Sequence, residues 1–179
     1  RFLMDGSNPE HDWQDMVPFE HSPFAMNPPQ GFLSSANQFP TPENYPYWVY
    51  DPVYEHYRNR RINMVLDSLD RITELDAKRL QNDNYNMNAA DKQPYLLDSL
   101  DRSSITEAQR KALTYLESWD YFNGPESIAA VYFEAWMDKF GVTVWDEFID
   151  YEESVSLPER WRTIELMNED PYNKYFDVF

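Results

Sequence analysis

Residues 106–119, TEAQRKALTYLESW, carry the clearest structural signal of the chain. Their apolar side chains recur at helical spacing, at Ala108, Ala112, Tyr115, Leu116 and Trp119. A stripe with this period follows one face of an α-helix, and a threonine directly before the first turn is a favourable N-cap. We therefore predict an amphipathic helix over residues 107–119 that begins after Thr106.

Helical spacing extends on both sides of this segment. We predict further helices over residues 54–69, 74–81, 87–100, 126–140, 144–151 and 159–167. Pro94 is expected to kink or restart its helix, and Gly141 is expected to cap the end of the helix over 126–140. Residues 53–179 are thus predicted to form a helical subdomain.

The first part of the chain has a different character. Nine of the thirteen prolines lie between Pro9 and Pro52, and each proline removes a backbone donor and disfavours helix in the residue before it. We predict that residues 1–52 are extended or β, with residues 31–37 as the best strand after a Pro-Pro-Gln-Gly turn. The predicted fold class is mostly α with a small β portion.

Composition excludes several classes of function. The 179 residues carry a formal net charge of −17, so we expect no nucleic-acid partner, because phosphate contacts need Lys and Arg. No apolar run approaches the roughly 18–20 residues of a membrane span, and no membrane partner is expected. The chain has no cysteine, which excludes disulfides and thiol chemistry, while its 17 % aromatic content argues against global disorder.

Local clusters leave alternatives open. The acidic run 146–153 lacks the spacing of a calcium loop and is better explained as a solvated helix face with Phe148 and Ile149 buried. Tyrosine and tryptophan side chains at 45–57 form either a sugar-stacking platform or a packing cluster. Basic residues gather at 58–61, where ion pairing on a helix surface is the simpler interpretation. The residues alone give no complete active site.

Three segments together are more specific. Residues 27–38 (NPPQGFLSSANQ), 45–47 (YPY) and 57–62 (YRNRRI) resemble the β chain of the penicillin acylase, or penicillin amidase, family. Weaker similarity runs from about residue 5 to about residue 140. The resemblance implies membership of the N-terminal nucleophile hydrolases, and it makes the chain part of a larger αββα fold.

The resemblance also implies a mechanism and site residues. In such enzymes an N-terminal Ser attacks an amide carbonyl, with its own α-amino group as the base. Asn37 matches the residue that donates a hydrogen bond to the oxyanion. Arg61 matches the arginine that orients this asparagine and lowers the pKa of the α-amine. Asp51 lies near the position of a calcium-ligating aspartate, so it is a candidate ligand of a structural calcium in the complete enzyme, while no cofactor is expected in this segment.

Two departures from the family pattern matter. Gln38 stands where a second Asn is usual, and Arg1 has no nucleophilic group. We therefore expect an internal fragment of the β chain, inactive alone, whose partners are the light chain and the remaining heavy chain of its own precursor and a small-molecule amide substrate. A periplasmic or secreted location is implied. The alternatives are an aromatic-rich helical binding module for glycans or peptides, and a purely structural helical domain.

Overall fold

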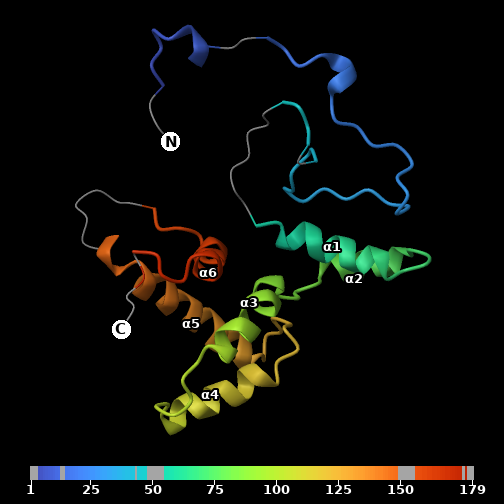
Figure 1. Cartoon of the computed structure of the whole chain (residues 1–179). Helices are drawn as coiled ribbons and strands as arrows, with labels where there is room; N and C mark the ends of the chain where they lie inside the picture. The colour runs from blue at the N-terminus through green and yellow to red at the C-terminus, as the bar shows by residue number, and fades with distance from the viewer. Residues whose placement is uncertain are drawn as a thin grey trace. The chain divides into compact units, whose positions relative to one another are not determined.

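A computed structural model describes residues 4–12, 15–42, 44–47, 55–148, 156–174 and 176. The chain forms two units, residues 1–56 and residues 57–179, and each is described by itself (Figure 1). The predicted boundary between residues 52 and 53 lies outside the described residues.

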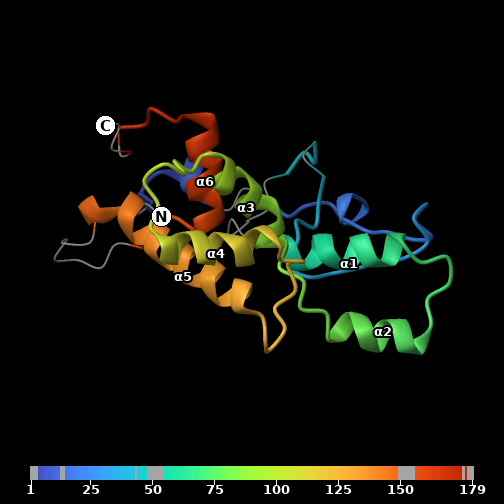
Figure 2. The same ribbon diagram turned by 90° about the horizontal axis from the view of Figure 1, so that it is seen from below.

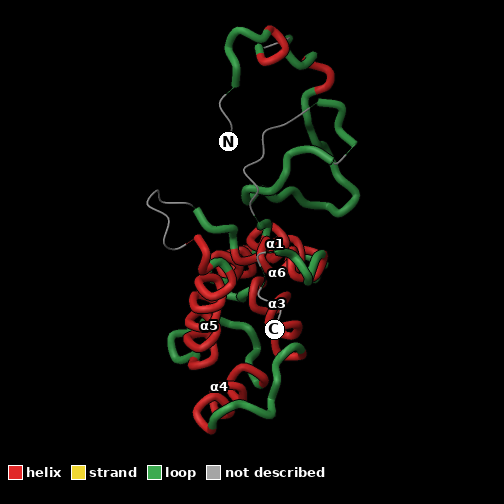
Figure 3. The backbone as a smooth tube through the Cα atoms, turned by 60° about the vertical axis from the view of Figure 1, so that its left-hand side comes forward, coloured by secondary structure: helices red, strands yellow, loops and turns green. Residues whose placement is uncertain are grey.

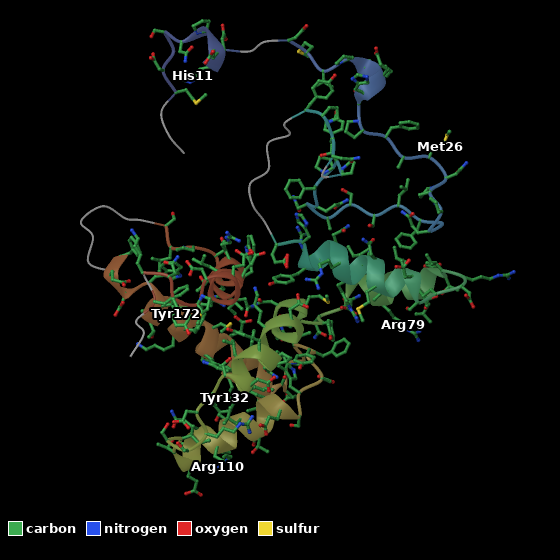
Figure 4. All side chains as sticks on the ribbon, in the orientation of Figure 1. His11, Met26, Arg79, Arg110, Tyr132 and Tyr172 are labelled. Carbon is green, nitrogen blue, oxygen red and sulfur yellow. The ribbon has the colours of Figure 1, made fainter. Side chains whose placement is uncertain are left out.

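The first unit consists mainly of loops and turns (Figure 3). The regular elements among its described residues are two short 3-10 helices, η1 (Pro9–His11) and η2 (Phe19–His21). Large apolar side chains of this unit are exposed, and Met26, at 74 % exposure, projects from the backbone in Figure 4. Within the described residues, the buried hydrophobic side chains all belong to the second unit, so the first unit has no core of its own.

The second unit is helical. It contains α1 (Tyr57–Asp67), α2 (Glu74–Gln81), α3 (Met87–Asp98), α4 (Glu107–Glu117), α5 (Ile128–Val144), the 3-10 helix η3 (Asp146–Phe148) and α6 (Arg160–Glu169). None of the helices in the described part is both long and apolar enough to span a bilayer.

The core of the second unit is formed by α3, α4, α5 and α6. Phe133 and Met137 of α5 are fully buried in it, and α4 lies beside α5 (Figure 2). Tyr132, labelled in Figure 4, stacks on Tyr115 of α4 with the ring centroids 6.0 Å apart. Trp145 follows α5 and donates its indole N–H to Thr163 Oγ1 of α6 at 2.9 Å, which fixes α6 to the end of α5.

The mostly helical fold is confirmed, and two predicted helix starts are observed as capping boxes at Thr73 and Thr106. Two details differ. The fifth helix begins at Ile128, because the Ser127 side chain accepts from Ala130 N–H and caps it there. Gly141, predicted to end this helix, lies inside it. Pro94, predicted to kink or restart its helix, lies inside α3, which does not restart there.

The predicted strand over residues 31–37 is not formed in the described structure, which contains no strand. A strand needs a neighbour for its backbone hydrogen bonds, and none of the described residues pairs with this segment. The β pairing that does form is an isolated antiparallel bridge between Tyr85 and Phe122, inside the helical unit. The larger αββα fold therefore stays a prediction.

Candidate active-site residues

Asn37, the predicted oxyanion donor, lies in a tight turn of the first unit. Its φ of 61° is in the left-handed region, which asparagine tolerates better than most residues. The side chain of Gln38 closes this turn: its Oε1 accepts from Ala36 N–H at 2.7 Å, and its Nε2 donates to the Ser34 carbonyl at 3.0 Å. Both bonds are partly shielded from water, so this Gln38 clasp restrains the backbone on either side of Asn37.

A second turn precedes the Asn37 segment. Gly31 N–H donates to the Pro28 carbonyl at 2.9 Å, and Gly31 has a φ of 79°, as the predicted Pro-Pro-Gln-Gly turn requires. Between the two turns, exposed and half-buried side chains alternate, with the exposed row at Leu33, Ser35 and Asn37. This period of two is typical of extended backbone. The segment therefore places Asn37 on its exposed face.

Arg61, the second predicted site residue, lies on α1 in the second unit. Its Nε and Nη2 both donate to the Asp83 carboxylate, at 2.9 and 2.7 Å. The side chains of this ion pair are 17 % and 15 % exposed. The hydrogen bond from Arg61 holds the pKa of Asp83 below its ordinary value, and the bond to Asp83 in turn raises the pKa of Arg61. Both groups are therefore charged at neutral pH.

Two aromatic rings lie next to each other against the Arg61 guanidinium. Its central carbon lies 4.3 Å from the ring centroid of Tyr85 and 5.6 Å from that of Phe122. The β-bridge holds these rings together, edge to face at 5.2 Å. Backbone bonds from Asn86 to Tyr121 and from Asn123 to Asn84 flank the bridge. We call Asp83, Tyr85 and Phe122 the Arg61 box.

The Arg61 guanidinium retains donor capacity. It has five N–H groups; two bind Asp83, and Nη1 lies 3.7 Å from Met64 Sδ. Two N–H groups thus have no acceptor among the described residues. Arg61 also borders a cavity of about 260 Å³. The cavity is lined by Tyr57, Arg58, Arg61, Ile62, Leu80, Gln81, Asp83, Tyr85 and Met87.

The ion-pairing interpretation of the basic cluster is confirmed for two of its arginines. Arg60 also binds a carboxylate through two nitrogens, those of Asp91 on α3, at 2.6 and 3.1 Å. That pair is more exposed, with side chains at 44 % and 34 %. Arg60 and Arg61 therefore form the same kind of contact in different environments.

The other predicted site residues are placed only in part. Asp51 lies outside the described residues, and no group of acidic or histidine side chains suited to a metal occurs among those that are described. Tyr45 and Tyr47 pack edge to face at 5.6 Å, and His21 Nδ1 lies 2.6 Å from the Tyr47 hydroxyl. Tyr45 and Tyr47 thus contact neighbouring rings and polar groups, and both interpretations of the cluster stay open.

Asn37 and Arg61 belong to different units, so the expected contact between them stays a prediction. The family comparison covers both. The family model described as Penicillin amidase matches residues 1–178. The chain belongs to the penicillin amidase family. The match is wider than the similarity over residues 5–140, and it confirms the assignment to the N-terminal nucleophile hydrolases. No solved structure matches this member of the family significantly.

Sequence reasoning did not find the contacts of either residue. Asp83 and Tyr85 lie within the weaker family similarity but were given no role, because they and Phe122 meet Arg61 only in the folded chain. Gln38 was noticed as a departure from the family pattern, but a glutamine side chain that binds two backbone groups has no signature in a single sequence.

Proposed function

We propose that this chain is part of an amidohydrolase that cleaves a linear amide with an N-terminal Ser nucleophile outside residues 1–179. The observation that carries the proposal is the penicillin amidase match over residues 1–178. The exposed position of Asn37 in its restrained turn supports the assigned role.

Asn37 suits an oxyanion donor for a chemical reason. Attack on an amide carbonyl places negative charge on its oxygen, and a preorganised donor stabilises that charge without reorganising during the reaction. An amide N–H is neutral and does not titrate, so it serves over the whole pH range. The Gln38 clasp supplies the preorganisation, since it restrains the backbone from Ser34 to Gln38.

Arg61 supports the same step in this proposal. As the family implies, Arg61 orients the Asn37 amide. Its positive charge lowers the pKa of the α-amine of the nucleophile. Because Asp83 binds the guanidinium directly and offsets much of this charge, we assign the larger part of the Arg61 contribution to hydrogen bonding.

Substrate and partners follow from the family. We expect an N-acyl compound, a penicillin side chain or an acyl-homoserine lactone as substrate. The partners are the light chain and the rest of the heavy chain, and the location is periplasmic or secreted. Asp51 remains the candidate ligand of a structural calcium, and no catalytic step is assigned to that ion.

The test uses the complete, self-processed enzyme. Asn37→Ala should lower kcat on the order of 10²–10³-fold, as loss of one oxyanion donor does elsewhere. Ser35→Ala, on the same exposed row, is the matched control and should keep wild-type kcat. N-terminal sequencing should show a heavy chain that begins with Ser, Thr or Cys upstream of Arg1. An Asn37→Ala enzyme with near-full kcat removes Asn37 from the mechanism, and a parent chain that is never processed removes the nucleophile.

A further inference from the structure

We propose that Asp83 is a positioning residue of the amidase reaction, acting by fixing the guanidinium of Arg61 in a single orientation. The inference rests on the proposed function. It assigns a role to a carboxylate that lies 22 residues from Arg61 in sequence.

The Arg61 box holds the guanidinium through one carboxylate and two adjacent aromatic rings. The two bonds to Asp83 fix its rotation within its own plane, because a fork of two parallel N–H groups matches one carboxylate geometry. Tyr85 and Phe122 lie against the guanidinium from one side and limit its movement toward them. An unrestrained arginine on a helix surface samples many rotamers. The contacts in the Arg61 box therefore suit a guanidinium that must keep one orientation during the reaction.

Asp83 is itself held in place. Its Oδ1 also accepts the backbone N–H of Tyr85 at 3.1 Å. That N–H belongs to the bridge residue that pairs with Phe122, so the carboxylate is tied to the backbone that carries both rings. The backbone of the β-bridge thus holds the Asp83 carboxylate, and the carboxylate holds the Arg61 guanidinium.

The pair between Arg60 and Asp91 shows what an ordinary ion pair looks like on the same helix. It also joins two nitrogens to one carboxylate, here Nη1 and Nη2 instead of Nε and Nη2, but its side chains are more than twice as exposed. The Arg60 guanidinium carbon lies 5.9 Å from the Tyr57 ring, compared with 4.3 Å between Arg61 and Tyr85. Surface pairs of this kind contribute little. The Arg60–Asp91 pair is thus a matched control for the pair of Arg61.

The experiment measures steady-state amide hydrolysis by the complete, self-processed enzyme. Asp83→Asn removes the charge and one acceptor, and Asp83→Glu keeps the charge but displaces the carboxylate by one methylene. Both variants should lower kcat on the order of tenfold or more with KM within about twofold, because a misplacement of about 1 Å can cost that much. Asp91→Asn and Asp91→Glu should keep wild-type kcat and KM.

Thermal unfolding of each variant separates positioning from folding. Asp83→Glu retains the ion pair and should unfold as the wild type does. A merely structural role predicts full kcat for a variant with wild-type unfolding. If Asp83→Asn does not fold, the comparison of Asp83→Glu with Asp91→Glu decides the question. Wild-type kcat in folded Asp83→Glu, or a raised KM with unchanged kcat, overturns the inference.

A double variant tests whether Asp83 acts through Arg61. Arg61→Ala combined with Asp83→Asn should have the kcat of Arg61→Ala alone, since there is nothing left to position. Additive losses overturn the inference. If Asn37→Ala and Arg61→Ala leave kcat unchanged, the proposed function fails first. If both lower kcat while the Asp83 variants behave like those of Asp91, only the present inference fails.

Discussion

Substitution of Gln38 by Met tests how the turn at Asn37 is held. Methionine keeps the length of the side chain but removes the amide, so both bonds of the clasp are lost. Each neutral hydrogen bond contributes roughly 0.5–1.5 kcal/mol net, or about 1–3 kcal/mol for the two. The left-handed backbone of Asn37 costs roughly 1–2 kcal/mol. The clasp and the strain are therefore of the same size.

The expected result follows from this balance. Without the clasp, the turn populates other backbone conformations, and each 1.4 kcal/mol or so lost from the productive one lowers the rate about tenfold. We expect kcat of the complete Gln38→Met enzyme to fall about 10–100-fold in an amide-hydrolysis assay. KM should change little, because the affected donor acts on charge that develops in the transition state.

Two further variants sharpen the comparison. Gln38→Glu keeps an acceptor for the Ala36 N–H but loses the donor to the Ser34 carbonyl, so an intermediate kcat is expected. Gln30→Met changes an exposed glutamine in the preceding turn and should have no effect. A folded Gln38→Met enzyme with wild-type kcat would refute the claim that this side chain holds Asn37.

Three predictions concern the stability of the helical unit and are checked by chemical or pH denaturation. Phe133→Ala should cost about 3–5 kcal/mol, since this side chain is fully buried, whereas Val131→Ala on the exposed side of the same helix should change stability by less than about 0.5 kcal/mol. Thr163→Val should cost about 1–3 kcal/mol, because it leaves the buried Trp145 N–H without its acceptor. The lowered pKa of Asp83 means that its stabilising contribution is present above its ordinary pKa of 3.8 and is lost as the pH falls through the lower folded value. Asp83→Asn should remove that part of the acid dependence, and an unchanged acid transition would contradict it.

The helices could be predicted because their signals are local. The capping boxes at Thr73 and Thr106 each lie within four consecutive residues, and apolar spacing shows within a few turns. The prediction that Gly141 ends its helix is wrong because the helix is extended by a contact between residues far apart in sequence. The helix continues to Val144 and delivers the buried Trp145 to Thr163 of α6, and this packing outweighs the roughly 1 kcal/mol cost of a glycine inside a helix.

In the candidate site, too, the residues with local sequence signals could be predicted, whereas contacts between distant residues could not. Asn37 and Arg61 could be named from the sequence because each lies in a motif that resembles a family. The partner of Arg61 could not, because the rest of α1, a loop and α2 separate Asp83 from it, and any of 32 acidic residues was eligible. The predicted strand is not formed for a related reason: the preceding turn indicates that the segment is extended, whereas a strand also needs a neighbour for its backbone hydrogen bonds.

The two site residues are therefore held in place by different kinds of contact. Asn37 is restrained by bonds that begin and end within five residues, in a unit without a core among its described residues. Arg61 is restrained by side chains from the segments at Asp83 and Phe122, whose positions depend on the packed helices. Damage to the helical core should consequently disturb the Arg61 box before it disturbs the turn at Asn37. In a complete enzyme that needs both residues, a substitution that damages the helical core would lower activity by displacing Arg61. Asn37 would keep its turn.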